Sequence, residues 1–410
     1  MSRYRGYAGK VIKINLSDET VSEYPWGEQE QALYLGGKAM AARILCDHLT
    51  GQETAFSEEN WIVISTGPLT GSGAPGSVRF DIAALSPKDN LPAFSNCSGN
   101  FGLYLKKAGY DALILTGRCK EKRWLEVYED QIVFHDATAL WGTGTGECQR
   151  KLTALLGTDR FGGLCIGPAG ENLVKFASIM SDDHAAGRAG IGAVFGWKNL
   201  KALAVSGSKK TRLHASDAAA ACNKEWHADL RSSVAGKATK GRPVCLSCPL
   251  HCTKHLHTEQ ESVLNELGMD AIAAEDAAIW AAEQGLPTQG FYVDMAYRRG
   301  IGNKLAEGVP HRTGKGGKRR SSSYDAITKA FDLSPGTPAT ERFCRDLTEA
   351  ISVAGQCMFT VNALRPDTPN LFVLQMLQYV TGMDLTLEDL LRIGGNSRML
   401  EKQLRQFFGK

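Results

Sequence analysis

Three cysteines lie close together near the middle of the chain. Cys245, Cys248 and Cys252 have the spacing C-x-x-C-x-x-x-C. Three neighbouring thiolates can hold an iron-sulfur cluster when a distant fourth ligand completes the set, so this spacing predicts a [4Fe-4S] site and redox chemistry. Zinc is the alternative, because thiolates and imidazoles also bind zinc. The imidazoles available nearby are those of His251, His255 and His257.

Two glycine-rich segments, residues 67–79 and 185–201, each contain an arginine: Arg79 in the first and Arg188 in the second. Glycines let backbone amides approach an anion closely, and a guanidinium group pairs well with phosphate. Neither segment has the pattern of a P-loop or of a dinucleotide-binding fingerprint. Together they favour a phosphate-bearing ligand, whereas either one alone reads as a cluster of turns.

The elements that must position these residues differ between the two halves of the chain. Short runs rich in β-branched residues predict strands in the first half, at residues 11–16, 61–65, 79–83, 112–116 and 202–205. Helical spacing appears there at 31–48, 100–109 and 147–156, and in the second half at 216–230, 262–283, 292–305, 340–354, 371–381 and 387–408. We therefore expect a mixed α/β domain over residues 1–210 and a helical region over 211–410. A glycine-, serine- and arginine-rich loop or linker is expected at 312–324.

The composition of the chain excludes several classes of function. The 410 residues include 47 basic and 44 acidic side chains, and this near balance argues against nucleic acid as a partner. No apolar run is long enough to cross a bilayer. The first residues lack the apolar core of a signal peptide, so the 11 cysteines fit a reducing compartment better than a disulfide framework. We expect a soluble, cytoplasmic protein.

Many motifs resemble those of the aldehyde ferredoxin oxidoreductases, which are tungsten-pterin enzymes with the same cysteine spacing. The similar segments follow one another in order at residues 7–11, 35–38, 66–71, 108–111, 166–172, 187–202, 298–308, 381–386 and 400–404. The resemblance implies an α+β fold. Its N-terminal mixed α/β domain would contain two related β-sheets that form a saddle beneath a pair of pterins, followed by a reduced all-helical region.

The resemblance also implies roles for residues around the phosphates. Arg79 corresponds to the arginine between the cluster and the pterin. Arg188, Ala189 and Gly190 correspond to a second phosphate-facing segment. The carbonyl groups of Asn96 and Ala189 correspond to ligands of a Mg²⁺ ion that bridges the phosphates of the two pterins, which suits the preference of Mg²⁺ for oxygen.

Two further motifs are present in altered form. Asn265, Gly268 and Asp270 belong to a segment that resembles the pterin-gripping motif D-x-x-G-L-D. Cys357 ends a segment that resembles the partner motif D-x-x-G-L-C, which makes it the implied fourth cluster ligand. Cys344 is the alternative ligand, although it lacks the glycine context.

The family resemblance implies oxidation of an aldehyde to a carboxylic acid, with electrons passing through the cluster to ferredoxin or to a partner iron-sulfur subunit. The chain is shorter than the family members, and Asn265 and Ser352 replace the first aspartates of the two motifs. The histidine that lies beside the metal in the family has no counterpart, and Glu259, Glu261 and His257 are the candidates to replace its acid-base role. Two alternatives therefore stay open: a paralogue that acts as an electron-transfer or structural subunit, and a zinc-stabilised binding module. The choice between tungsten and molybdenum, the substrate and self-association also stay open.

Overall fold

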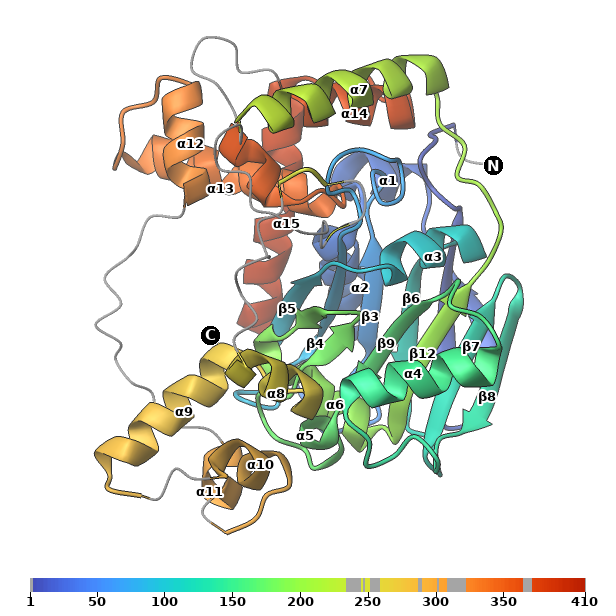
Figure 1. Ribbon diagram of the computed structural model, residues 1–410. Coiled ribbons are helices and arrows are strands. Elements are labelled where there is room, and N and C mark those ends of the chain that lie inside the picture. Colours follow the sequence, from blue (N-terminus) through green and yellow to red (C-terminus); the bar gives the residue numbers. More distant parts are fainter. Residues whose placement is uncertain are drawn as a thin grey trace.

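The structure is a computed structural model of the chain (Figure 1). It describes residues 3–233, 245, 248–250, 259–286, 290–300, 302–307, 322–363 and 371–409. Within these residues the strands lie between Lys10 and Ser206, and the described elements after Ser206 are helices. None of the described helices combines the length and the apolar composition needed to cross a membrane.

The strands form two six-stranded sheets. The first has the order β2-β1-β6-β3-β4-β5 and the second the order β11-β10-β9-β12-β7-β8. The strands of the first sheet are β1 (Lys10–Asn15), β2 (Thr20–Tyr24), β3 (Ile62–Thr66), β4 (Phe80–Leu85), β5 (Pro92–Cys97) and β6 (Tyr110–Thr116). Those of the second are β7 (Arg123–Tyr128), β8 (Gln131–Asp136), β9 (Gly162–Ile166), β10 (Ile179–Ser181), β11 (His184–Ala186) and β12 (Leu200–Ser206).

The two sheets repeat one topology. Each strand of the second sheet occupies the place of the strand six positions earlier in the first. In each sheet one pair is parallel, β1 with β6 and β7 with β12, and the remaining pairs are antiparallel. The expected α+β fold with two related sheets is therefore confirmed.

Both faces of the central strands are covered. In β3, Ile62 and Ile64 contribute to a core shared by the two sheets, and Val63 packs on the opposite face against α2 (Gly37–His48) and α15 (Leu387–Phe407). The outer face of the second sheet packs against α4 (Thr145–Leu156). Helices α3 (Phe101–Ala108) and α6 (Ile191–Trp197) contact strands of both sheets. Burial on two faces explains why these strands read as continuous apolar runs.

One expected helix is divided in the structure. The segment 31–48 contains the end of α1 (Glu28–Tyr34) and the whole of α2, separated at Leu35 and Gly36. A Cβ on Gly36 would lie 2.5 Å from the Thr66 carbonyl oxygen, so the chain approaches β3 closely at this point. Leu35 has a φ of 54°, which is unfavourable for a branched residue and ends the first helix.

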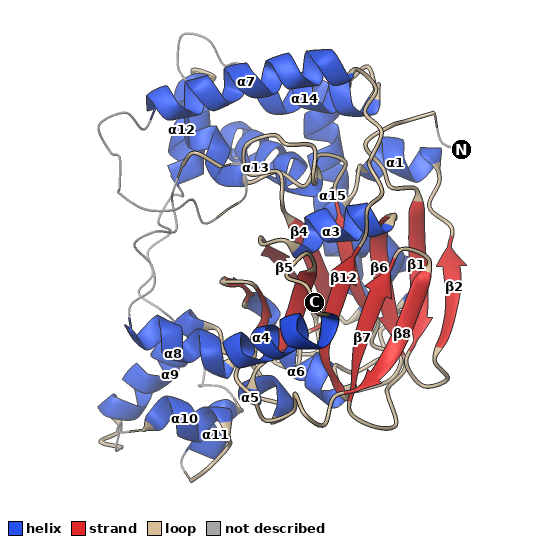
Figure 2. Ribbon diagram, turned by 45° about the vertical axis from the view of Figure 1, so that its right-hand side comes forward, coloured by secondary structure: helices blue, strands red, loops and turns tan. Residues whose placement is uncertain are grey.

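The helices of the second half form two separate groups (Figures 1 and 2). One shares a core and consists of α7 (Ser216–Ser233), α12 (Ser322–Ala330), α13 (Pro338–Val353), α14 (Phe372–Thr381) and α15. The other contains α8 (Glu259–Leu267), α9 (Ala271–Glu283), α10 (Phe291–Ala296) and α11 (Gly302–Ala306), and it packs on α5 (Pro168–Glu171). Two short 3₁₀ helices, η1 (Arg188–Gly190) and η2 (Met358–Ala363), complete the described elements.

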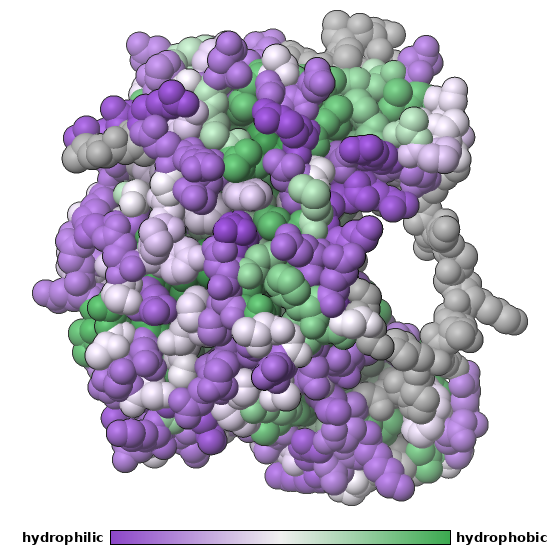
Figure 3. Space-filling model, turned by 180° about the vertical axis from the view of Figure 1, so that it is seen from behind, coloured by the Kyte–Doolittle hydropathy of each residue, from purple (hydrophilic) through white to green (hydrophobic). Residues whose placement is uncertain are grey.

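The division at residue 210 remains a prediction, although the strands end at Ser206. Of the expected linker 312–324, residues up to 321 lie outside the described part of the chain, and α12 begins at Ser322. Seen from behind, the surface is largely hydrophilic, with hydrophobic residues in scattered groups (Figure 3).

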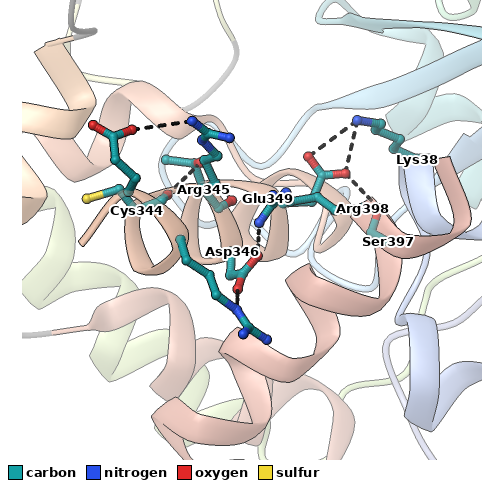
Figure 4. Close-up of polar contacts among 10 residues, drawn as sticks. Lys38, Cys344, Arg345, Asp346, Glu349, Ser397 and Arg398 are labelled. Atoms are coloured by element: carbon teal, nitrogen blue, oxygen red, sulfur yellow. Dashed lines mark hydrogen bonds and ion pairs between the residues drawn. The ribbon is translucent and has the colours of Figure 1, made fainter. Parts of the chain in front are cut away.

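Polar side chains join α13 and α15 to the first sheet's helix α2 (Figure 4). The Lys38 ammonium lies 3.1 Å from a carboxylate oxygen of Glu349 and 2.8 Å from one of Glu401. The Ser397 hydroxyl donates to Glu349 at 2.6 Å. On the same helix pair, Arg398 donates to Asp346 at 2.5 Å. These contacts fix the end of α13 over the first sheet.

A buried ion pair fastens the N-terminal segment. The Lys106 ammonium donates to Asp111 at 2.5 Å, and both side chains are 2% exposed. The same carboxylate accepts the backbone N–H groups of Ala8 at 3.0 Å and Gly9 at 2.7 Å. Two of the family-like motifs, residues 7–11 and 108–111, are thus the two sides of one structural contact.

We predict that Asp111→Ala lowers the free energy of unfolding by about 3–5 kcal/mol, because it leaves the buried Lys106 ammonium without its counter-charge. The matched control is Asp130→Ala, whose exposed carboxylate pairs with Lys10 and should contribute less than about 1 kcal/mol. Urea unfolding of the full chain, followed by circular dichroism, measures both. Equal stability of the two variants would contradict the assignment.

Candidate functional site

The first glycine-rich segment connects β3 to β4 and packs on the chain that follows α13. The Leu69 N–H donates to the Ala354 carbonyl at 2.9 Å, and the Cys357 N–H donates to the Gly76 carbonyl at 3.2 Å. A Cβ on Gly67 would lie 2.1 Å from the Ala354 carbonyl carbon. Only glycine permits this approach, so the glycines here bring two distant segments together.

Arg79 lies at the end of this segment, and its guanidinium group connects two predicted site residues. Nη2 donates to the Cys357 sulfur at 3.3 Å, and Nη1 donates to the Asn96 side-chain oxygen at 3.1 Å. Burial opposes the charge, but the sulfurs of Cys357 and Cys245 hold the pKa of Arg79 above its usual value. The structure therefore brings together Arg79, Asn96 and Cys357, which lie far apart in the sequence.

Cys245 lies close enough to Arg79 to affect its charge. Its sulfur is 3.3 Å from the Ser98 hydroxyl and 3.5 Å from Nε2 of His184. The Cys248 N–H donates to the Cys245 carbonyl at 3.2 Å, so these two cysteines lie close together. Ser98 and His184 were not singled out as site residues from the sequence. His184 belongs to an Asp-Asp-His triplet that reads as an ordinary acidic turn, and only the tertiary contact with Cys245 distinguishes it.

The ligand set predicted for the cluster is only partly visible. Cys252 lies outside the described residues, as do His251, His255 and His257. Among the residues that the structure does describe, no group of three or more histidine, cysteine or acidic side chains is arranged to hold a metal ion. The assignment of Cys245, Cys248, Cys252 and Cys357 as ligands remains a prediction. Thiolate donors beside a partly buried guanidinium fit an anionic iron-sulfur cluster.

Cys344, the alternative fourth ligand, lies in an apolar environment. It belongs to the core that α13 forms with α7 and α14, and burial raises the pKa of its thiol to about 11. A buried cysteine of this kind behaves as a small apolar residue. The structure favours Cys357 over Cys344, because Cys357 is the cysteine that contacts Arg79.

The second phosphate-facing segment follows β11. Ala189 has a φ of 76°, a rare conformation for a residue with a side chain, and Gly190 has a φ of 68°. A Cβ on Gly190 would lie 2.0 Å from the Lys175 carbonyl oxygen. The 3₁₀ turn η1 contacts β5, the strand that contains Asn96. The segment of Arg188 and Ala189 therefore lies beside the strand that contains Asn96.

A cavity of about 270 Å³ lies at this junction. Arg188 and Ala189 line it from η1, and Ala93 and Phe94 line it from β5. Its charged lining consists of the basic side chains of Lys38, Lys88, Arg188 and Arg405 and the acidic ones of Asp89 and Glu401. The excess of basic groups suits an anionic ligand.

The motif that contains Asn265, Gly268 and Asp270 reaches the same region. The Ser178 N–H donates to the Gly268 carbonyl at 2.8 Å, and Gly268 has a φ of 72°. Asp270 caps α9 by accepting from the Ile272 N–H at 3.2 Å. Asp270 lies close to the segment of Arg188, because a Cβ on Gly187 would lie 3.7 Å from the Cβ of Asp270. Burial raises the pKa of Asp270, and the charge of Arg188 opposes that rise.

Asn265 has a backbone role in the structure, since its carbonyl accepts from the Thr145 hydroxyl at 2.9 Å. Ser352 plays a similar part at the end of α13, where its carbonyl accepts from the Gly355 N–H at 2.9 Å. The carbonyls of both residues thus shape turns. Of the candidates for proton transfer, His257 lies outside the described residues, while Glu259 and Glu261 lie on α8.

The sequence reasoning missed Asp81. Its side chain is buried on β4 and accepts from Nδ2 of Asn96 at 3.1 Å. Burial raises the pKa of Asp81 to about 7, against the hydrogen bond from Asn96 and the charge of Lys38. The sequence did contain an indication of this role. Asp81 is a carboxylate in the otherwise apolar strand Phe80–Leu85, and a buried carboxylate requires a specific partner.

Comparison with known proteins adds to this geometry. Residues 11–207 match the family model described as "Aldehyde ferredoxin oxidoreductase, N-terminal domain". The tungsten-containing aldehyde ferredoxin oxidoreductase of Thermococcus kodakarensis is 38% identical over 206 residues, which cover 50% of this chain and 34% of that protein. The WOR-like subunit of the aliphatic sulfonate oxidoreductase of Pyrococcus furiosus is 37% identical over 219 residues, covering 49% of this chain and 35% of that protein. The matched region thus spans about a third of each relative.

The fold resembles a solved structure over nearly its whole length. The active-site complex BamBC of benzoyl coenzyme A reductase, with bound 1,5-dienoyl-CoA, superposes with a TM-score of 0.84 and 20% identity. The match covers 99% of this chain and 90% of that chain. At this identity the likeness shows the fold, including the helical half. Residues 11–207 thus belong to the family of aldehyde ferredoxin oxidoreductase N-terminal domains, in agreement with the 38% identity to the relative from Thermococcus kodakarensis.

Proposed function

We propose that this protein is a pterin-dependent oxidoreductase, containing tungsten or molybdenum, that oxidises an aldehyde to a carboxylic acid. The reaction takes up water and releases the acid with two protons and two electrons. The metal cofactor would supply the chemistry of oxygen-atom and electron transfer. The protein would orient the reacting groups and pass single electrons onward. Cys245, Cys248, Cys252 and Cys357 hold a [4Fe-4S] cluster, from which ferredoxin or a partner iron-sulfur subunit receives the electrons.

The position of Arg79 carries this proposal. One guanidinium group donates to Asn96 at 3.1 Å and to the Cys357 sulfur at 3.3 Å. It therefore lies between the predicted phosphate side of the site and the predicted cluster side. A cation at this position stabilises the negative charge of both a phosphate group and a thiolate-bound cluster.

The basic cavity supports a phosphate-bearing cofactor. Arg188 lines the cavity and lies beside the segment of Asp270. The carbonyls of Asn96 and Ala189 are hard oxygen donors on neighbouring segments, and they would serve a Mg²⁺ ion that shields the phosphates from each other. Asp270 remains available to accept from pterin N–H groups, together with the turn at Gly268.

An electron-transfer or structural subunit is the second candidate function. It is favoured by the substitution of aspartate by Asn265 and Ser352, whose carbonyls shape turns in the structure. The alignments with the two relatives, which cover 50% and 49% of this chain, favour it as well. A zinc-stabilised binding module is the third candidate, because thiolates also suit zinc.

Metal and cofactor analysis of the anaerobically purified protein separates the three. Tungsten or molybdenum together with iron and extractable pterin is the expected result. Iron alone would support the electron-transfer subunit, and zinc alone would support the binding module. Reduction of a dye acceptor by aldehydes then tests the reaction itself.

We predict that Cys357→Ser abolishes the broad visible absorbance of the cluster and most of the bound iron, because a [4Fe-4S] cluster needs its fourth thiolate. Cys344→Ser is the matched control, since Cys344 is a buried cysteine of the neighbouring helix and lies in an apolar core. It should keep both the spectrum and the iron. A full spectrum in the Cys357 variant would overturn the ligand assignment.

We also predict that Arg188→Ala lowers the amount of extractable pterin about 10-fold, because it removes a charge-assisted hydrogen bond to phosphate worth roughly 1.5–3 kcal/mol. Arg160→Ala, which alters an exposed arginine outside the cavity, is the control and should leave the yield unchanged. Equal pterin yields from the two variants would contradict a phosphate role for Arg188.

A further inference from the structure

Asp81 is linked through Asn96 to the contact between Arg79 and Cys357. It pairs with Asn96 across the antiparallel strands β4 and β5, so the two side chains start from adjacent positions. Asp81 is 2% exposed, whereas Asn96 lies at the surface. A buried carboxylate at this position is costly unless it makes a specific hydrogen bond, and its side-chain partner is Asn96.

The amide of Asn96 has one orientation that satisfies both neighbours. Nδ2 donates to the Asp81 carboxylate at 3.1 Å, which turns Oδ1 toward the Arg79 guanidinium, where it accepts at 3.1 Å. The ionised Asp81 carboxylate only accepts and a guanidinium only donates, so the reversed amide would face donor with donor and acceptor with acceptor. Asp81 and Arg79 therefore together determine which way the amide points, and Asp81 holds its nitrogen end.

The oriented amide in turn positions Arg79. With Nη1 held by Asn96, the planar guanidinium presents Nη2 to the Cys357 sulfur at 3.3 Å. Lys38, the cation whose charge reaches Asp81, is already engaged with Glu349 and Glu401. The Lys38 backbone also hydrogen-bonds to the Asp81 carboxylate, so the side-chain hydrogen bond of this carboxylate is the one from Asn96.

We propose that Asp81 is a positioning residue that, through Asn96, holds Arg79 against the sulfur of Cys357. The role of this contact in setting a cluster potential rests on the proposed function. The positioning of Arg79 does not, because it can be observed in the protein without a cofactor.

Two substitutions of Asp81 isolate the effect. Asp81→Asn removes the charge and keeps an oxygen that accepts from Asn96, whereas Asp81→Leu has the same branched shape and removes both. Asn96→Ala breaks the same link from the surface and leaves the buried residue intact, so it tests the proposal even where Asp81→Leu does not fold.

The first measurement uses the metal-free protein. Nitrogen-15 NMR reports the guanidinium protons of Arg79, with Arg79→Lys identifying its signal. We expect slowly exchanging Arg79 protons in the wild type and in Asp81→Asn, and loss of that signal in Asp81→Leu and Asn96→Ala. Retention of the signal in Asn96→Ala, or identical behaviour of the two Asp81 variants, would overturn the proposal.

The second measurement is the reduction potential of the cluster in the reconstituted protein. Losing the buried negative charge, common to both Asp81 variants, raises the potential. Losing the Arg79 hydrogen bond lowers it, since hydrogen bonds to the sulfurs stabilise the reduced cluster. We therefore expect a lower potential in Asp81→Leu than in Asp81→Asn, and no such difference when Asn96→Ala is also present. Equal potentials of the two variants would contradict the positioning role of Asp81. Failure of the wild type to bind iron would refute the proposed cluster, and the NMR result would then decide on the role of Asp81.

Discussion

The close packing of the glycine-rich segment against residues 354–357 is the constraint on which the site depends. Without a side chain at Gly67, the chain after β3 can reach the Ala354 backbone, and this approach brings Arg79 into contact with Cys357. The contact joins the end of α13, in the helical half, to the first sheet. Its electrostatic consequence is a partly buried guanidinium whose charge is stabilised by cysteine sulfurs.

The repeated sheet topology explains why a second segment lies where it does. β5 ends the order of the first sheet and β11 ends that of the second, and these two edge strands contact each other. Asn96 lies near the end of β5, and Arg188 follows β11, the strand that takes the place of β5 in the second sheet. The basic cavity forms at their junction. A symmetric ligand with two phosphate groups would suit such an arrangement.

Much of the fold could be predicted from the sequence, because burial leaves a local signature. The central strands are covered on both faces and therefore appear as short apolar runs, and the long helices show helical spacing. Interruptions were missed where tertiary packing imposes them, as at Gly36, which must approach Thr66. Asp81 and His184 were missed as site residues for the same reason, since their partners Asn96 and Cys245 are distant or on another strand.

By itself the sequence determined the types of residue available for chemistry: a cysteine array, two arginines among glycines, and family motifs that predicted two related sheets. These are local patterns, which can be recognised from residue spacing and composition. Only the tertiary structure decided that Arg79 contacts Cys357 and not Cys344, that Asp270 lies near Arg188, and that Asp81 stands behind Asn96. Such choices depend on backbone approaches of a few ångströms between segments far apart in the chain, and no local pattern specifies which of several chemically similar residues will be the one in contact.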